Sequence, residues 1–306
     1  MGGNSLIDPA LPPTVENQFA ITARAMVPIA ALLARGERLV ITHGNGPQVG
    51  FIAMRSALSK DHMHEVPLDS IVADTQGSLG YMIERALREE LGRRGVQRHV
   101  ACLVTEVEAD PHDEAFGHPT KPVGKFCNKA EAMALKAERG WDIVHVPGRG
   151  YRRVVPSPAP RKIIHLPVIR MLIEADVVVV CCGGGGIPVM RTDDGHLHGL
   201  AAVIDKDRVS ALLGARLGAY RLCLTTSAGH VYRGFGTDDA EPLETVTVAE
   251  LRSMAAAGEF PPGSMAPKVE SACRFLEHGG KEAIICTPDD LEMAFDGKTG
   301  TRITLE

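Results

Sequence analysis

Three lysines lie in short segments whose neighbours restrict where a flexible side chain can point. Lys121 lies between prolines in HPTKPVG, Lys206 between two aspartates in VIDKD, and Lys268 directly after a proline in PGSMAPK. A lysine is most often a solvated surface charge or half of a surface ion pair. Rigid flanks around all three favour a shared task, because proline restricts the backbone from which each side chain projects. Gathered ammonium groups could neutralise a phosphoryl group in transfer.

Glycine-rich turns are the second feature with chemical potential. They occur at residues 2–4, at residues 42–50 (THGNGPQVG) and at residues 181–189 (CCGGGGIPV). Ligands of parallel sheets bind at the carboxyl ends of strands, where glycines let backbone N–H groups surround phosphate oxygens. One such turn is weak support for a ligand site, but three favour a phosphate or nucleotide site. The residues expected to line it are Gly2, Gly3, Asn4, Gly44, Asn45, Gly46, Gly183, Gly184 and Gly185.

Familiar nucleotide-binding motifs are absent from these turns. A dinucleotide fingerprint G-x-G-x-x-G would need glycine where the sequence has Val49 and Pro188. The chain also has no G-x-x-x-x-G-K-[ST] loop and no protein-kinase H-R-D segment. A nicotinamide oxidoreductase is therefore a remote alternative, and the glycines indicate a phosphate site of another architecture.

Buried strands alternate with helices along the chain. Short apolar runs rich in β-branched residues predict strands at 38–42, 100–107, 142–146, 176–182, 220–225 and 282–286. Helical patterns lie at 14–35, where Pro28 should kink or split the helix, and at 75–94, 129–139, 161–175, 207–214 and 264–278. Capping signals at Thr247 and Thr287 start two more helices. This alternation predicts an α/β sandwich with a mostly parallel sheet.

One segment interrupts the alternation. Residues 108–160 are rich in proline, glycine, histidine and charge, and they hold the single tryptophan, Trp141. We interpret the segment as a lid inserted into the α/β domain, with a set of long surface loops as the alternative.

Composition excludes several classes of partner. The net charge of −5 offers no basic surplus for nucleic acid, and no uninterrupted apolar run approaches 18 residues. The start of the chain lacks the pattern of a signal peptide. The seven cysteines form no C-x-x-C pair, so we interpret them as reduced thiols. We expect a cytoplasmic protein with small-molecule substrates, no nucleic-acid partner and no membrane partner. The histidine pairs His62/His64 and His196/His198 are interpreted as exposed loop residues rather than metal ligands.

Ordered blocks along nearly the whole chain resemble the carbamate kinases of the amino-acid kinase superfamily. The resemblance implies an open α/β/α sandwich with a mostly parallel central sheet. It implies a single domain over residues 1–306, with a protruding lid subdomain inserted at about residues 110–156, and a homodimer. The blocks that carry it are GGN, THGNGPQVG, PTKPVGKF, GRGYRRVVPSP, CGGGGIPV, AVIDKD, PGSMAPKVE and GTRI.

The resemblance also implies an activity and roles for residues. Carbamate kinases interconvert ATP plus carbamate with ADP plus carbamoyl phosphate, and Mg²⁺ travels with the nucleotide; no metal held by protein side chains is expected. The reaction usually runs toward ATP, in catabolism of arginine or related nitrogen compounds. Lys121, Lys206 and Lys268 match the lysines of the transfer site, and Asp207 matches an acid that orients them. His43 is expected to support the second glycine turn by hydrogen bonding.

Several features leave alternatives open. The family has a first apolar strand before Gly-Gly-Asn, and we expect this strand to be missing from the chain as given. Thr226 and Ser227 stand where the family tends to have an acidic residue near the nucleotide. A non-catalytic or impaired ligand-binding homologue is therefore an alternative, as is another amino-acid kinase acting on a carboxylate or phosphate. Arg149, Arg152 and Arg153 could contact phosphate or serve the fold.

Overall fold

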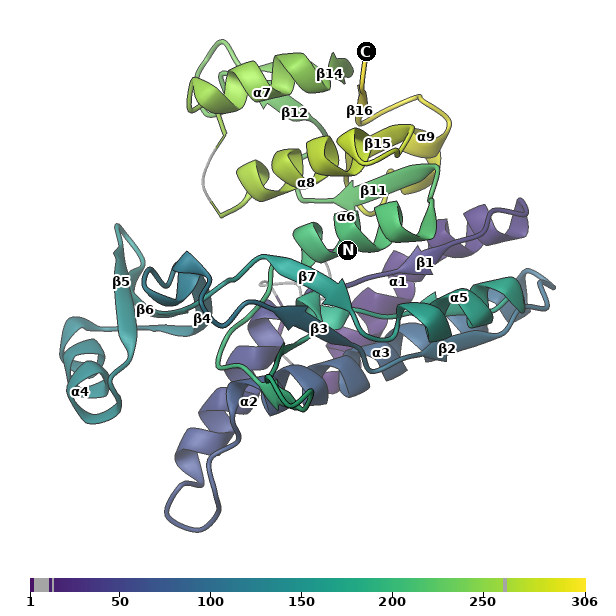
Figure 1. Cartoon of the computed structure of the whole chain (residues 1–306). Coiled ribbons are helices and arrows are strands. Elements are labelled where there is room, and N and C mark those ends of the chain that lie inside the picture. Colours follow the sequence, from purple (N-terminus) through teal and green to yellow (C-terminus); the bar gives the residue numbers. More distant parts are fainter. Residues whose placement is uncertain (3–10, 13, 261–262) are drawn as a thin grey trace.

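A parallel sheet covered by helices on both faces forms the centre of the computed structural model, which describes residues 1–2, 11–12, 14–260 and 263–306 (Figure 1). Its strands lie in the order β1-β8-β2 and pair in parallel, with Val179 of the middle strand beside Val40 and Ala101. All three coincide with apolar runs that predicted strands. Their bounds are Val40–Ile41 for β1, Val178–Val180 for β8 and Val100–Cys102 for β2.

The middle strand shows why this sheet needs two layers of helix. Val178 and Val180 point into a cluster with helices α1 (Val15–Ala34) and α3 (Leu68–Arg93). Val179 points to the other face, where it packs against α5 (Leu166–Glu174) and α6 (Lys206–Leu217). Alternate side chains of a strand face opposite ways, so a strand that is apolar throughout must be covered twice. The result is the α/β/α layering expected from the sequence.

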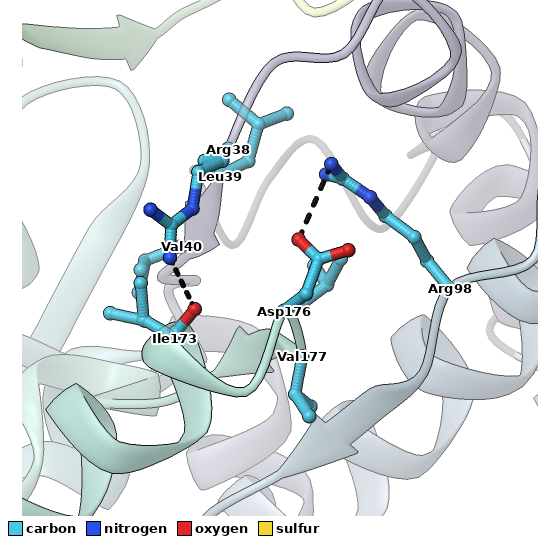
Figure 2. Close-up of a pocket in the computed structure, with 8 residues that line it drawn as sticks. Arg38, Leu39, Val40, Arg98, Ile173, Asp176 and Val177 are labelled. Carbon is cyan, nitrogen blue, oxygen red and sulfur yellow. Dashed lines mark hydrogen bonds and ion pairs between the residues drawn. The ribbon is translucent and has the colours of Figure 1, made fainter.

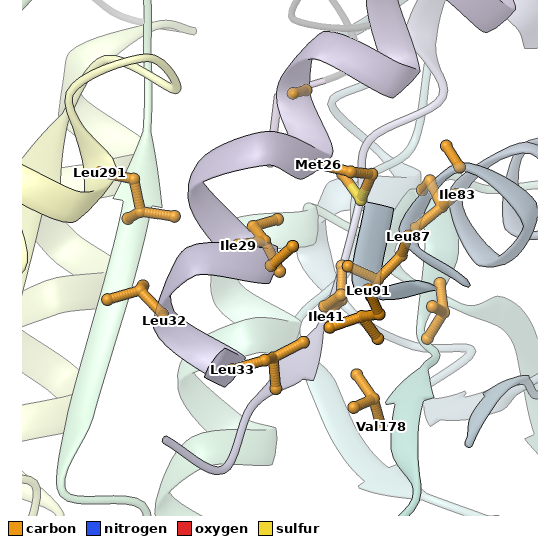
Figure 3. Packing of buried hydrophobic residues seen from close by; sticks show 14 of the residues in the cluster. Met26, Ile29, Leu32, Leu33, Ile41, Ile83, Leu87, Leu91, Val178 and Leu291 are labelled. Atoms are coloured by element: carbon orange, nitrogen blue, oxygen red, sulfur yellow. The ribbon is translucent and has the colours of Figure 1, made fainter. Parts of the chain in front are cut away.

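Helices α1 and α3 supply most of the first core cluster. Met26, Ile29 and Leu33 of α1 meet Ile83 and Leu87 of α3 above the sheet (Figure 3). Each fully buried aliphatic side chain stabilises the fold by about 1.5–3 kcal/mol. This packing explains a correction. The sequence predicted that Pro28 kinks or splits the helix, but α1 is one helix through Pro28, because its apolar face is held on both sides of the proline; the kink stays a prediction.

A second sheet continues the α/β architecture in the later part of the chain. Its strand order is β11-β15-β16-β14, parallel except for the antiparallel β15–β16 pair. Helices α7 (Val248–Ala256) and α8 (Met265–Glu277) pack on one face, while β15 also contributes to the cluster around α1. The strands are β11 (Arg221–Thr225), β15 (Glu282–Cys286), β16 (Thr301–Thr304) and β14 (Thr245–Thr247), and α9 (Leu291–Phe295) lies between β15 and β16 in the sequence.

The segment after β2 builds a third sheet and a projecting subdomain. The third sheet has the order β10-β9-β3-β7, and the three-stranded antiparallel sheet β4-β6-β5 with helix α4 stands out from the body (Figure 1). We define the lid as residues 121–155, which contain this antiparallel sheet and α4. Bounds are β3 (Glu106–Ala109), β7 (Pro160–Ile163), β9 (Ile187–Arg191), β10 (Leu197–Gly199), β4 (Lys121–Cys127), α4 (Lys129–Arg139), β5 (Asp142–Val146) and β6 (Gly150–Val155); β12 (Val231–Arg233) and β13 (Glu241–Leu243) form a separate hairpin pair.

Several elements differ from the expectations. The run at 100–107 is divided between β2 and β3, and the pattern at 161–175 begins with strand β7 before α5. Helix α3 starts at Leu68, about two helical turns before the start expected at residue 75. Helix α2 (Gly46–Leu58) was not expected, because its glycines obscured the helical pattern; Pro47 in its first turn is the signal that marks it.

Helix α1 has the length and mean hydropathy, 1.2, of a helix that could cross a membrane. No uninterrupted apolar run of that length exists in the sequence, and the value arises as an average over the helix. Half of the 18-residue stretch of α1 that gives this value is buried inside the protein, against α3 and the sheet. The apolar character of α1 is that of a core helix.

The two ends of the parallel sheet differ in what they offer a ligand. At the amino ends of β1, β8 and β2 a cavity of about 40 Å³ is lined by Arg38, Arg98 and Asp176, among others (Figure 2). Arg98 pairs with Asp176 at 3.3 Å, and Arg38 donates to the Ile173 carbonyl. This cavity has room for little more than a water molecule. The glycine turns follow the carboxyl ends of the strands.

The first residue lies beside the end of β1. The Met1 amine donates to the Thr42 carbonyl at 2.8 Å, and the Gly44 N–H donates to the Met1 carbonyl at 2.9 Å. Gly2 follows directly, whereas Gly3 and Asn4 lie outside the described residues. The absence of a family-type first strand stays a prediction.

The lid root rests on helix α2 through two glycines. A Cβ placed on Gly50 would lie 2.9 Å from the Cα of Gly124 in β4, so the two backbones approach closely. Val123, beside this contact, packs in one cluster with Val49 of α2 and with Val203. The position of β4 therefore depends on the absence of a side chain at Gly50.

We expect Gly50→Ala to lower the free energy of unfolding by about 1–3 kcal/mol, because the new methyl group overlaps the Gly124 backbone. Urea denaturation measures the change. Gly77→Ala is the matched control, since Gly77 is also inside a helix but, beyond the helix's own backbone, no heavy atom of the described residues lies within 4 Å of its Cβ position. That control should gain about 0.5–1 kcal/mol. Equal effects at the two positions would contradict the close approach.

Candidate active site

Two lysines from different helices share one carboxylate. Lys206 opens α6, and Lys268 lies in the first turn of α8. Oδ2 of Asp207 accepts hydrogen bonds from Lys206 Nζ at 3.1 Å and from Lys268 Nζ at 3.0 Å. Asp207 and Lys268 are 4% and 6% exposed, so this ion triad is shielded from water. Helices from separate parts of the chain thus bring two cationic side chains together.

The third lysine reaches the same region from the lid. Lys121, the first residue of β4, places Nζ 2.5 Å from Oδ2 of Asp205. Asp205 is also the N-cap of α6, and its Oδ1 accepts from the N–H groups of Asp207 and Arg208. One carboxylate therefore starts the helix and holds the lid lysine beside it. Asp205 was not among the predicted site residues, although an aspartate directly before a helix is a capping signal.

Burial and charge act in opposite directions on this cluster. Burial raises the pKa of Asp205, but Lys121 and Lys206 outweigh it and hold the pKa below its usual value. Asp207 behaves likewise: burial raises its pKa, and Lys206 with Lys268 lowers it further than burial raises it. Both carboxylates are therefore charged at neutral pH.

The two buried lysines respond differently although they share Asp207. Burial lowers the pKa of Lys206, but Asp207 and Asp205 together raise it above its usual value. For Lys268, burial and repulsion from Lys206 prevail, and its pKa is lowered. Both lysines contact Asp207 directly, but the attraction of the two carboxylates outweighs burial only at Lys206.

The third glycine turn fits closely against the second. A Cβ on Gly183 would lie 2.4 Å from His43 Nε2, and a Cβ on Gly184 would lie 2.1 Å from Asn45 Nδ2. Gly184 has φ +67° and its N–H donates to the His43 carbonyl at 2.7 Å. Glycine is required here both by the contact and by the left-handed backbone. The two turns form one surface at the carboxyl ends of β1 and β8.

Polar residues of α3 hold these turns in place. Asn45 Nδ2 donates to Thr75 Oγ1 at 2.8 Å. Gln76 clamps the backbone of Thr105, accepting from its N–H at 2.7 Å and donating to its carbonyl at 3.0 Å. Thr105 Oγ1 in turn accepts from the Cys182 N–H. These buried contacts position the turns. Neither Thr75 nor Gln76 was predicted as a site residue, because polar residues inside a helix carry no motif.

His43 supports the turns as a neutral side chain. It is 1% exposed, and its Nδ1 lies 3.1 Å from the Gly44 carbonyl, so Nδ1 carries the proton. Burial lowers the pKa of His43 to about 4. The imidazole is therefore uncharged at neutral pH and packs against Gly183.

Most of the residues predicted for the site lie in these contacts. Lys121, Lys206, Lys268 and Asp207 surround the ion cluster, and the second and third glycine turns face each other. The exposed pairs His62/His64 and His196/His198 take no part in the contacts of the ion cluster or of the turns.

The lid arginines pack on lid aromatic rings. Arg149 and Arg152 lie over Phe126, at 4.7 and 5.2 Å from the ring centre, and Arg153 lies 4.3 Å from that of Trp141. Arg152 Nε also donates to the Gly124 carbonyl. Of the two roles considered for these arginines, the described contacts are those of a structural role.

We expect His43 to make the protein acid-sensitive. In the unfolded chain it takes up a proton below its usual pKa of about 6.5, whereas in the folded protein it does so only near pH 4. As the pH falls from 6.5 to 4, proton uptake therefore favours unfolding, by about 3 kcal/mol in total. Urea denaturation across this range, for the protein and for His43→Gln, isolates the effect. The same pH slope in both would contradict it.

Comparisons with known proteins agree with this architecture. The sequence profile described as the amino acid kinase family matches residues 1–287. The carbamate kinase-like protein YahI of Escherichia coli (strain K12) is 43% identical over 306 residues, which covers 99% of this chain and 96% of that protein. Carbamate kinase of Pyrococcus horikoshii is 40% identical over 307 residues, covering 99% of this chain and 97% of that protein.

Solved structures show the same relation. A structure of carbamate kinase from Giardia lamblia bound to AMP-PNP has a TM-score of 0.92 and 35% sequence identity. The match covers 99% of this chain and 96% of that chain. Similarity at this level extends over the sheets, the lid and the glycine turns. The chain therefore belongs to the amino acid kinase family, and within that family to the carbamate kinases.

Proposed function

We propose that the chain catalyses reversible phosphoryl transfer between ATP and carbamate, giving ADP and carbamoyl phosphate. The observation that carries this proposal is the gathering of Lys121, Lys206 and Lys268 around two buried carboxylates. The named relatives and the AMP-PNP bound by the Giardia enzyme support the same activity. The metabolic direction toward ATP, in catabolism of arginine or related compounds, rests on the family resemblance alone.

The charge of the cluster suits a moving phosphoryl group. Three ammonium groups and two carboxylates leave one positive charge in excess, in surroundings that are largely shielded from water. Phosphoryl transfer spreads negative charge over the phosphate oxygens, and fixed cations stabilise that charge most where water is excluded. The two carboxylates keep the cations close together before any ligand arrives.

The chemistry needs no side chain that removes a proton. In the ATP-forming direction, an oxygen of the ADP β-phosphate attacks phosphorus, the bond from phosphorus to the carbamate oxygen breaks, and carbamate leaves as an anion. Lys206 and Lys268 are placed to neutralise the transferred group, and Lys121 does so from the lid. The first N–H groups of α2, which have no carbonyl partner within the helix, would position the phosphate oxygens.

We propose that the nucleotide phosphates, rather than a metal site built by protein side chains alone, hold the Mg²⁺ ion. The described part of the chain contains no group of three or more His, Cys, Asp or Glu side chains that could hold a metal ion. Both carboxylates of the cluster are already paired with lysines. We propose that Mg²⁺ enters on the phosphates of the nucleotide, as the resemblance implies.

The family resemblance also bears on the oligomeric state and on the cellular compartment. The chain is proposed to work as a homodimer in the cytoplasm. Sedimentation as a species of one-chain mass, or recovery outside the cytoplasm on cell fractionation, would contradict these two points.

The direct test is a coupled assay of ATP formation from carbamoyl phosphate and ADP. We expect turnover that depends on both substrates and on Mg²⁺. Binding of ADP and carbamoyl phosphate without ATP formation would instead support the alternative, an impaired or non-catalytic homologue. Turnover with another acyl phosphate but not with carbamoyl phosphate would indicate a different amino-acid kinase.

We expect Lys206→Ala to lower kcat and kcat/KM together, by about 10²–10³-fold, because the lost charge acts mainly in the transition state. Folding should change little, since Asp207 keeps its contact with Lys268. Lys298→Ala, which removes an exposed lysine, is the matched control and should retain full activity. Near-normal turnover of the purified Lys206→Ala protein would remove Lys206 from the mechanism.

A further inference from the structure

Gln48 carries a buried amide group that the fold does not use. The residue is 5% exposed, and neither Oε1 nor Nε2 has a hydrogen-bond partner among the residues that the structure describes. Leaving one buried polar group unsatisfied costs about 1–3 kcal/mol. An amide without partners therefore lowers the free energy of unfolding. A ligand that binds beside it would supply the missing hydrogen bonds.

The position of Gln48 brings this amide to the candidate site. It is the third residue of α2, directly after the glycine turn that contains Asn45 and Gly46. Side chains of a helix tilt toward its N-terminus, so Gln48 leans toward that turn. Its neighbour Val49 packs with Val123 and Val203, which are two residues from Lys121 and Asp205 respectively.

The start of α2 is also open toward a ligand. Asn45, the N-cap residue, makes no capping hydrogen bond with its side chain, which turns instead to Thr75. No heavy atom lies within 4 Å of a Cβ position on Gly46, counting the described residues. The first N–H groups of a helix have no carbonyl partner within it and favour an anion.

The chemistry of the orphan amide differs from that of the other groups in the site. The three lysines can only donate hydrogen bonds, and Asp205 and Asp207 already accept from them. Gln48 Oε1 is an acceptor without an assigned donor, next to a donor, Nε2, without an assigned acceptor. A carbamoyl group presents the complementary pair, an N–H and a carbonyl oxygen side by side.

We propose that Gln48 recognises the carbamoyl group of the substrate: Oε1 accepts an N–H of its amino group, and Nε2 donates to its carbonyl oxygen. This inference rests on the proposed function and names the residue that separates carbamoyl phosphate from an acyl phosphate without an amino group. Acetyl phosphate has a methyl group in that place, and its binding would leave Oε1 unpaired and buried. Sites that hydrogen-bond a substrate group reject analogues that lack it.

The first test compares carbamoyl phosphate with acetyl phosphate as donors to ADP, in the protein and in Gln48→Met. Methionine has nearly the length of glutamine but no hydrogen-bonding amide. We expect the ratio of kcat/KM values for the two donors to fall about 10- to 100-fold in the variant, with KM for ADP unchanged. An unchanged ratio would overturn the proposal.

Urea unfolding of Gln48 variants distinguishes ligand recognition by Gln48 from a structural role of its amide. If the Gln48 amide forms hydrogen bonds only with a ligand, Gln48→Met and Gln48→Leu should unfold at the same or higher urea concentration than the unchanged protein. A large loss of stability in both variants, or failure of both to fold, would show that the amide holds the protein together. That result would overturn the proposal.

A binding experiment separates this inference from the activity. Phosphonoacetamide and acetonylphosphonate are stable analogues that differ by an amino group in place of a methyl group, and calorimetry measures their binding to the intact protein. We expect a preference for phosphonoacetamide that Gln48→Met removes. If the protein makes no ATP, the proposed function fails, but this preference still supports recognition by Gln48. Equal binding of both analogues to the unchanged protein overturns it.

Discussion

Like charges must be held together for this site to exist. Two buried ammonium groups repel each other strongly, and the structure counters that repulsion with Asp207 placed between them. Asp205 does the same for the lysine that comes from the lid. Removing one carboxylate would leave uncompensated buried charge, which is far more costly than an exposed broken pair. The arrangement of α6, α8 and β4 around these two carboxylates follows from that requirement.

The backbone of the sheet meets the complementary need, a surface that admits negative charge. β1 and β8 end in turns whose glycines have no side chains, so the two turns pack closely against each other and against His43 and Asn45. Neutral His43 and the amide of Asn45 support these turns without adding an anion that would repel phosphate. At the opposite end of the sheet, the small cavity beside Arg98 is lined by the ion pair of Arg98 with Asp176. Because the strands run in parallel, the candidate site lies at their carboxyl ends.

The sequence predicted the convergence of the lysines better than it predicted the elements that support them. Lysines with rigid flanks, and glycines after strands, carry local signals, and the two turns after β1 and β8 meet as expected. Helix α2 was overlooked because glycine weakens a helical pattern, and the split expected at Pro28 did not occur because long-range packing outweighs the lost hydrogen bond. Thr75, Gln76 and Asp205 act through contacts with residues far away in the chain, which no local pattern records.

Helix α2 contacts both the candidate site and the root of the lid. Its first residue, Gly46, belongs to the turn at the site, and Gly50, one helical turn later, lies against Gly124 of the lid. A helix of this length is stiff, so its start cannot shift while the seat of the lid stays in place. A displacement of the turn at Gly46 would therefore also displace the root of the lid, where Gly50 lies against Gly124.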